Sequence, residues 1–251
     1  MALALWIGAA WISPAAARQS AQSPEPASAA QPAQGWPEAV TRMSQWVAAS
    51  GDNGGLPFVI VDKRAAKVFV FAADGQLLGR APALIGSARG DDLTPGDSNR
   101  EMSAIPLNER TTPAGRFVAS FGSAKGGEKV LWVDYATAIA LHPVVTANPK
   151  ERRLQRLKSP TARDNHITHG CINVADAFYK KVVRPTFTGT AGIVYVLPEK
   201  TPMEEVFPTF REAATVASTG DASETRAIQH PSDASPSGPA SPANAAAALS
   251  R

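Results

Sequence analysis

Short runs of apolar residues, separated by Gly, Pro and Asp, dominate the middle of the chain. Runs of this length bounded by turn residues are typical of β-strands. They predict strands at residues 58–62, 67–72, 76–80, 84–85, 116–120, 130–133, 138–142 and 193–197. The part of the chain from Trp36 to about Phe210 is therefore expected to be mainly β, within the α+β class.

Two segments show helical periodicity instead. Residues 37–49 place their large apolar side chains on one face, and Pro37 suits the first turn of a helix. Residues 174–183 do the same, with Pro185 beyond the expected end of the helix. Residues 36–56 are therefore expected to form an N-terminal helix and lead-in.

The ends of the chain differ from this middle part. An apolar run and the sequence Ala15-Ala16-Ala17 predict a signal peptide at residues 1–17, cleaved before Arg18. An uncleaved anchor is the alternative, although the run is short for a bilayer span. Gln, Ser, Ala and Pro dominate a linker at 18–35 and a tail at 213–251, which are expected to be disordered.

Charge and cysteine content exclude several classes of protein. The formal net charge is only +3, which gives no electrostatic case for nucleic acid or an anionic membrane as partner. Cys171 is the single cysteine, so an internal disulfide and a cysteine-only metal site are excluded. A lone thiol is most often buried filler, and its neighbours must decide whether it does chemistry.

The neighbours of Cys171 favour a nucleophile. Asn173 is a preferred N-cap residue and Asp176 resembles the acidic partner of a capping box, which would place the thiol just before a helix. The helix dipole would then favour the thiolate. Gly170 permits a tight turn, and we expect the amides of Gly170 and Cys171 to face a developing oxyanion.

A cysteine nucleophile needs a base, and three histidines are candidates: His142, His166 and His169. His142 ends the apolar run 138–141, so it is expected at the end of a strand, where a rigid scaffold presents side chains. An isolated histidine in that position more often has a structural role.

The hexapeptide 168–173, THGCIN, resembles the signature of the L,D-transpeptidase (YkuD-like) catalytic domain. The turn Thr112-Pro113-Ala114-Gly115 and the strand Ile139-Ala140-Leu141-His142 resemble two further motifs of that family. The resemblance covers about residues 57–198, followed by a C-terminal extension at 199–212. It implies a β-sandwich or open barrel with one helix after the cysteine turn.

The resemblance also implies roles for individual residues. Cys171 would be the nucleophile and His142 the base, with the carbonyl of Pro143 as the third member. His169 would line the site and help to place the cysteine. Thr168 would brace the turn by hydrogen bonding.

Two features depart from the family pattern. Asn173 stands where many relatives carry Arg, and it would both cap the helix and face the pocket. The second departure is an insertion, residues 143–167, which carries six basic and two acidic residues. In a functional interpretation, the insertion is a basic lid with a short helix anchored by Leu154 and Leu157. Its candidate carboxylate-binding residues are then Arg152, Arg153 and Arg156. A solvated surface loop is the alternative.

The activity implied by the resemblance is that of an exported cysteine acyltransferase in the periplasm or cell envelope, with no cofactor. Its partners would be peptidoglycan stem peptides, with an envelope protein as an alternative acceptor, and no nucleic acid and no membrane span after signal cleavage. Cys171 would form a thioester with a tetrapeptide stem and pass it to an amine, whereas transfer to water would make it a carboxypeptidase. Two further hypotheses stay open: a metal site built from His142, His166, His169 and Cys171, and a non-catalytic wall-binding domain.

Overall fold

The computed structural model describes residues 35–93, 104–124 and 126–210. The predicted signal peptide, nearly all of the 18–35 linker and the 213–251 tail lie outside the described residues. Within the described ranges, no helix combines the length and the apolar composition that a membrane crossing requires.

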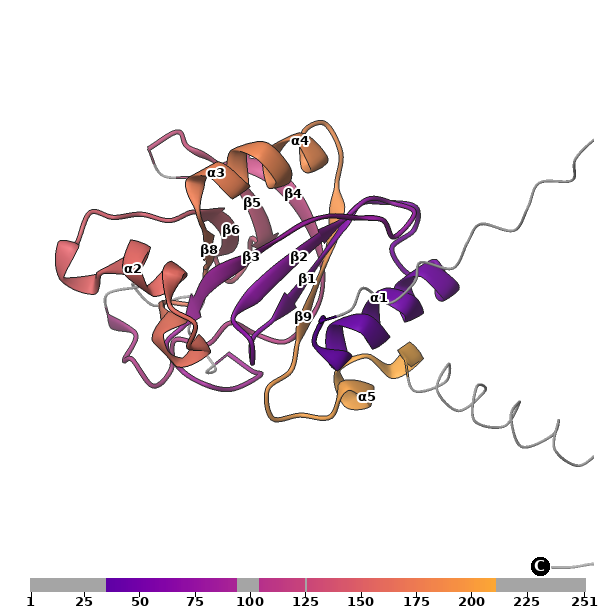
Figure 1. Cartoon of the computed structure of the whole chain (residues 1–251), viewed down its shortest axis with the longest axis horizontal. Helices are drawn as coiled ribbons and strands as arrows, with labels where there is room; N and C mark the ends of the chain where they lie inside the picture. The colour runs from indigo at the N-terminus through magenta and orange to yellow at the C-terminus, as the bar shows by residue number, and fades with distance from the viewer. Residues whose placement is uncertain (1–34, 94–103, 125, 211–251) are drawn as a thin grey trace, which may run out of the picture.

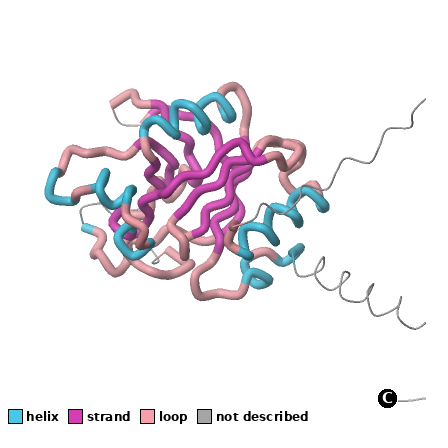
Figure 2. The backbone as a smooth tube through the Cα atoms, in the orientation of Figure 1, coloured by secondary structure: helices cyan, strands magenta, loops and turns pink. Residues whose placement is uncertain are grey.

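Eight strands close into a barrel (Figure 1). The order around it is β2-β1-β9-β4-β5-β6-β8-β3, and pairing of β3 with β2 completes the circle, while β7 adds to β3 as a ninth strand. The strands are β1 (Phe58–Asp62), β2 (Lys67–Phe71), β3 (Leu77–Gly86), β4 (Gly115–Ser123), β5 (Lys129–Asp134), β6 (Ile139–Pro143), β7 (His166–Thr168), β8 (Ile172–Val174) and β9 (Gly192–Leu197). The expected mainly β fold is confirmed, and its form is a mixed barrel (Figure 2).

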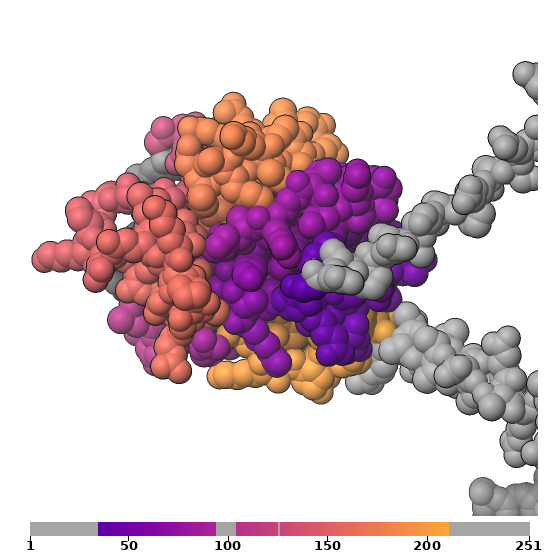
Figure 3. Space-filling view, in the orientation of Figure 1, coloured from indigo at the N-terminus to yellow at the C-terminus, as the bar shows by residue number. Residues whose placement is uncertain are grey.

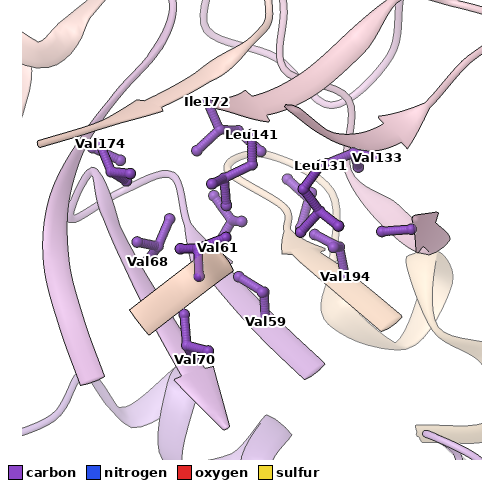
Figure 4. Packing of buried hydrophobic residues seen from close by; sticks show 14 of the residues in the cluster. Val59, Val61, Val68, Val70, Leu131, Val133, Leu141, Ile172, Val174 and Val194 are labelled. Carbon is purple, nitrogen blue, oxygen red and sulfur yellow. The ribbon is translucent and has the colours of Figure 1, made fainter. Parts of the chain in front are cut away.

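Successive side chains of each strand point to opposite faces of the sheet, and this arrangement builds two apolar layers. Inward-facing residues such as Val59, Val61 and Val194 fill the barrel (Figure 4). Their neighbours Phe58 and Ile60 face outward and are covered by α1 (Glu38–Ser50) and by residues around α5 (Met203–Val206). Because both faces of β1 are buried, its sequence is a nearly continuous apolar run.

The strand predictions hold for all the longer strands. Residues 76–80 and 84–85 belong to one strand, β3, rather than two. The strands β7 and β8 were not expected, and each has only three residues. A run that short carries no recognisable period.

The prediction of a helix beginning directly after Asn173 is wrong. Residues Ile172–Val174 form β8, in which Asn173 pairs with His142 of β6 and with Leu84 of β3. The helix starts at Asp176, and its N-cap is Ala175, which makes no side-chain capping bond. Sheet pairing on both sides therefore outweighs the capping pattern.

The same helix continues further than expected. It runs from α3 (Asp176–Phe178) through the π-helical segment η5 (Tyr179–Val183) into α4 (Arg184–Phe187). Pro185 lies in the first turn of α4 rather than beyond the end of the helix. Its missing N–H is tolerated there because η5 has already changed the hydrogen-bond pattern.

The insertion at residues 143–167 forms a compact segment that projects from one end of the molecule (Figures 1 and 3). It contains η3 (Pro149–Glu151), α2 (Arg153–Lys158) and η4 (Ala162–Asn165) before the chain enters β7. Leu157 is buried, whereas the side chain of Leu154 is exposed, so only one of the two expected anchors holds α2.

Candidate active site

The register of β6 and β8 brings Cys171 and His142 to the same face of the barrel. The two strands are parallel neighbours, with Leu141 opposite Ile172 and His142 opposite Asn173. Leu141 and Ile172 point into the barrel core (Figure 4). Because side chains alternate along a strand, His142 and Asn173 point outward, as does Cys171, one residue before Ile172.

His142 is held as a neutral imidazole. Its Nδ1 lies 2.8 Å from the carbonyl oxygen of Pro143. A carbonyl can only accept, so Nδ1 carries the proton and Nε2 is left as the basic nitrogen. Burial lowers the pKa of His142 and so favours the uncharged ring. A contact between His142 and the Pro143 carbonyl was implied by the resemblance to the family, and the structure contains it.

Asn173 completes this arrangement, and Arg153 fixes its orientation. The Nδ2 of Asn173 lies 2.9 Å from His142 Nε2, while its Oδ1 accepts a 2.8 Å hydrogen bond from Arg153 Nη1. With Oδ1 occupied by the guanidinium, only the amide N–H groups can face the imidazole. Asn173 thus faces the site as expected, although it caps no helix.

Arg153 is itself constrained. Its Nε donates to Glu151 Oε2 at 2.5 Å, and its side chain is only 14% exposed. The chain of contacts from Arg153 through Asn173 to His142 was not predicted from the sequence. The only sequence signal for it was the density of arginines in the insertion.

The thiol of Cys171 is half-buried, and its sulfur lies 3.6 Å from the carbonyl oxygen of Ala138. Burial raises the pKa of the thiol, while the backbone of Ala140 and the positive charge of Arg153 act in the opposite direction. We expected a helix dipole to favour the thiolate. The helix begins five residues after Cys171, so the thiol lies too far from its first turn for this effect. The resting group is therefore a protonated thiol that needs a base.

Cys171 and His142 make no direct hydrogen bond in this structure, because each is bonded to another partner. Contacts of this kind often tighten only when substrate binds. The single lone pair of His142 Nε2 accepts the Asn173 amide N–H, so His142 can take a proton only after that hydrogen bond has opened.

The turn before Cys171 is cross-braced by Thr168. Its hydroxyl donates to Cys171 O at 2.6 Å and accepts from Gly170 N at 3.2 Å. The Gly170 amide is therefore occupied, contrary to the expectation that it faces an oxyanion, and the Cys171 amide remains the candidate donor.

Gly170 is required by both conformation and space. Its φ is +126°, and a Cβ would lie 2.6 Å from Ile139 Cδ1 and 2.8 Å from Thr111 O.

The other two histidines lie in different surroundings. His169 is half-buried, and its pKa is lowered by burial and by the charges of Arg110 and Arg153. His166 bonds Gly86 O through Nδ1 at 3.1 Å, and its Nε2 is 3.9 Å from Glu199. Among the residues that the structure describes, no group of three or more His, Cys, Asp or Glu side chains could hold a metal ion.

The three arginines predicted to bind substrate separate into two groups. Arg156 donates to the carbonyls of Glu151 and Asp164, and Arg152 bonds the side chain of Gln155, so both hold the insertion together. They line a small cavity of about 280 Å³ on the insertion itself. Only Arg153 reaches the residues around the thiol.

The sequence of the barrel matches a known protein family. The model of the L,D-transpeptidase catalytic domain (YkuD) matches residues 57–196, and the chain belongs to that family. No curated protein matches the chain in sequence.

Several solved structures resemble the chain at low identity. The catalytic domain of an L,D-transpeptidase from E. faecium is 16% identical over 56% of this chain and 96% of that one, with a TM-score of 0.33. The helical cell shape determining protein Pgp2 from Campylobacter jejuni is 15% identical over 64% of this chain, with a TM-score of 0.40. L,D-transpeptidase 1 from Mycobacterium tuberculosis is 16% identical over 56% of this chain, with a TM-score of 0.30. The matches span 57% of the Pgp2 chain and 61% of the mycobacterial chain.

Proposed function

We propose that this protein is an exported cysteine acyltransferase that acts on peptidoglycan stem peptides in the periplasm or cell envelope. The observation that carries the proposal is a neutral, oriented His142 on the same barrel face as the single thiol, inside a domain of the L,D-transpeptidase family. Membership of a family that acts on peptidoglycan supports the location and the class of substrate.

In the first half-reaction, His142 Nε2 takes the thiol proton and Cys171 Sγ attacks the carbonyl of the third residue of a tetrapeptide stem. The C–N bond to the terminal D-amino acid breaks, and the imidazolium returns the proton to the departing amine. The Cys171 amide is the candidate donor to the oxyanion that forms during the attack. The product is a thioester between Cys171 and the shortened stem.

In the second half-reaction, an amine attacks this thioester and regenerates the thiol. An amine on a second stem would give a cross-link, and a lysine of an envelope protein would give an anchored protein. A thioester reacts readily with amines and hydrolyses slowly, which favours acyl transfer over carboxypeptidase activity.

The direct test uses the purified protein with a tetrapeptide stem that ends in a D-amino acid, with and without an added amine. We expect release of one D-amino acid per stem, a protein adduct with the mass of the shortened stem, and an amide product when the amine is present. If only the shortened free acid forms at every amine concentration, the protein is a carboxypeptidase. If no D-amino acid is released and no adduct forms, the proposal fails.

Arg153 has a specific place in this mechanism. Burial raises the pKa of the Cys171 thiol, and the positive charge of Arg153 opposes that rise, which helps to stabilise a developing thiolate. Its hydrogen bond holds Asn173 beside His142. It is also the one arginine of the three predicted anchors that lies close enough to the site to meet a substrate carboxylate.

Arg153→Ala is expected to lower the rate of Cys171 acylation about tenfold, because the thiol pKa rises when the nearby positive charge is removed. The thiol pKa is read from the pH dependence of iodoacetamide alkylation, which is clean because the chain has one cysteine. Lys158→Ala, on the exposed side of the same helix, removes the same charge away from the site and serves as control. Equal thiol pKa values and equal acylation rates in the two variants would contradict the assignment.

A further inference from the structure

Lys63 is a buried cation outside the catalytic residues. It follows β1 directly, and its side chain is only 1% exposed. Its ammonium group donates to Gly90 O at 2.5 Å, to Asp91 Oδ1 at 2.9 Å and to Thr112 O at 2.9 Å. An ammonium group has three donors, so all three are used and the side chain has one defined position.

The partner carboxylate is equally fixed. Asp91 accepts hydrogen bonds from the backbone N–H groups of Glu199, Lys200 and Thr201. Burial alone would raise the pKa of Asp91, but these amides and Lys63 lower it well below its ordinary value. Asp91 therefore keeps its negative charge at neutral pH, and although burial lowers the pKa of Lys63, its hydrogen bond to Asp91 acts in the opposite direction. A buried pair with every position satisfied resists displacement.

The third acceptor connects this pair to the catalytic turn. Thr112, which is 1% exposed, accepts from Lys63 through its carbonyl. Its hydroxyl accepts from Gly86 N at 2.9 Å and donates to Gly170 O at 2.7 Å. Gly170 O is the carbonyl of the peptide bond that enters Cys171.

Packing reinforces these hydrogen bonds. A Cβ on Gly170 would lie 2.8 Å from Thr111 O, so the backbone at Thr111 and Thr112 lies directly against the turn. A shift of Thr112 would therefore move Gly170, and a shift of Gly170 would move the sulfur of Cys171.

We propose that Lys63 is a positioning residue for acyl transfer: acting through Thr112, it holds the Gly170–Cys171 turn so that the thiol is placed for attack. The inference rests on the proposed cysteine chemistry. The catalytic residues identified by sequence motif lie between 142 and 173, whereas this support comes from the end of β1, from the segment after β3 and from the turn before β4.

The test compares two reactions of Cys171 in the full chain. Acylation by a carbapenem requires an oriented thiol, whereas alkylation by iodoacetamide, measured at a pH at which the thiol is ionised, requires only an accessible one. Lys63→Met, which keeps the length of the side chain and removes the charge, is expected to lower the maximal acylation rate about 10- to 100-fold without slowing alkylation. The carbapenem concentration at half-maximal rate should change little.

A control that removes a buried polar group outside this network is Tyr195→Phe. Tyr195 is fully buried on the α1 side of β9, where its hydroxyl donates to Asp52 Oδ2 at 2.5 Å. The loss of this bond should lower the melting temperature but leave the acylation rate within about twofold of wild type, because additivity holds for sites with no shared partners. If Lys63→Met acylates as fast as Tyr195→Phe, the inference is wrong.

A second pair of variants covers the case in which Lys63→Met does not fold. Thr112→Val removes the hydroxyl that bonds Gly170 O, and Thr112→Ser keeps it. We expect the valine variant to lose acylation and the serine variant to retain it, and equal rates in the two would overturn the connection through Thr112. A wild-type protein that alkylates but does not acylate would instead refute the proposed function itself.

Discussion

Cys171→Ala is expected to abolish covalent acylation of the protein. After exposure to a carbapenem, the intact wild-type chain should gain the mass of one adduct, and the variant should gain none. The reason is that the chain has a single cysteine, so no second thiol can replace it. Loss of an activated nucleophile lowers the acylation rate by about 10⁴-fold or more, so the adduct should fall below the detection limit of the mass measurement.

The substitution is informative because it changes little else. Cys171 lies in the turn before β8, and the neighbouring contacts of Thr168 and Gly170 use backbone atoms of the turn. The melting temperature should therefore stay within a few degrees of wild type. Cys171→Ser provides a second variant with an oxygen in place of sulfur, and it should also remain unlabelled. An adduct of equal yield on Cys171→Ala would refute the assignment of the nucleophile.

The strands that could be predicted from the sequence are those whose own apolar residues show which faces are buried. Strands β1 and β9 are covered on both faces, by the barrel core and by the layer under α1, and they read as continuous apolar runs. The strands β7 and β8 could not be predicted because three residues show no period. Their conformation is determined by neighbours distant in sequence, β3 and β6.

The helix after the cysteine shows how local and tertiary preferences compete. Asn173 and Asp176 have the spacing of a capping box, and in isolation they favour a helix that begins at once. In the folded protein, Asn173 instead pairs in the sheet and bonds both His142 and Arg153. The residue that signalled a cap is thus used at the candidate site.

At the candidate site, too, contacts between residues close in sequence could be predicted, whereas contacts between distant segments could not. The motif named Cys171, His142 and the Pro143 carbonyl from residues near one another in sequence, and the contact between His142 and Pro143 lies within β6. The supports from Arg153 and Lys63 join residues 20 and 49 positions apart. Hydrogen bonds between such distant segments follow from barrel closure and from the path of the insertion, which no local pattern encodes.

His142→Ala is expected to lower the acylation rate by about 10²- to 10⁴-fold, the usual contribution of a general base. Burial raises the thiol pKa and lowers the pKa of His142, so both groups are uncharged at neutral pH. In wild type, the rate should rise with pH as His142 loses its proton. Because its pKa lies below the ordinary 6.5, the full rate should extend to a lower pH than an unperturbed histidine would allow. In the variant this rise should disappear, and the remaining rate should increase only as the thiol ionises at alkaline pH.

His169→Ala is the matched control, because it removes an imidazole two residues from the nucleophile. His142 has the Pro143 carbonyl to fix its tautomer and Asn173 at its basic nitrogen, and these contacts give it the geometry of a base. The His169 variant should therefore keep the rise of rate at low pH even if its maximal rate falls. If His169→Ala alone removed that rise while His142→Ala retained it, the roles of the two histidines would be reversed, and the Pro143 contact would be structural only.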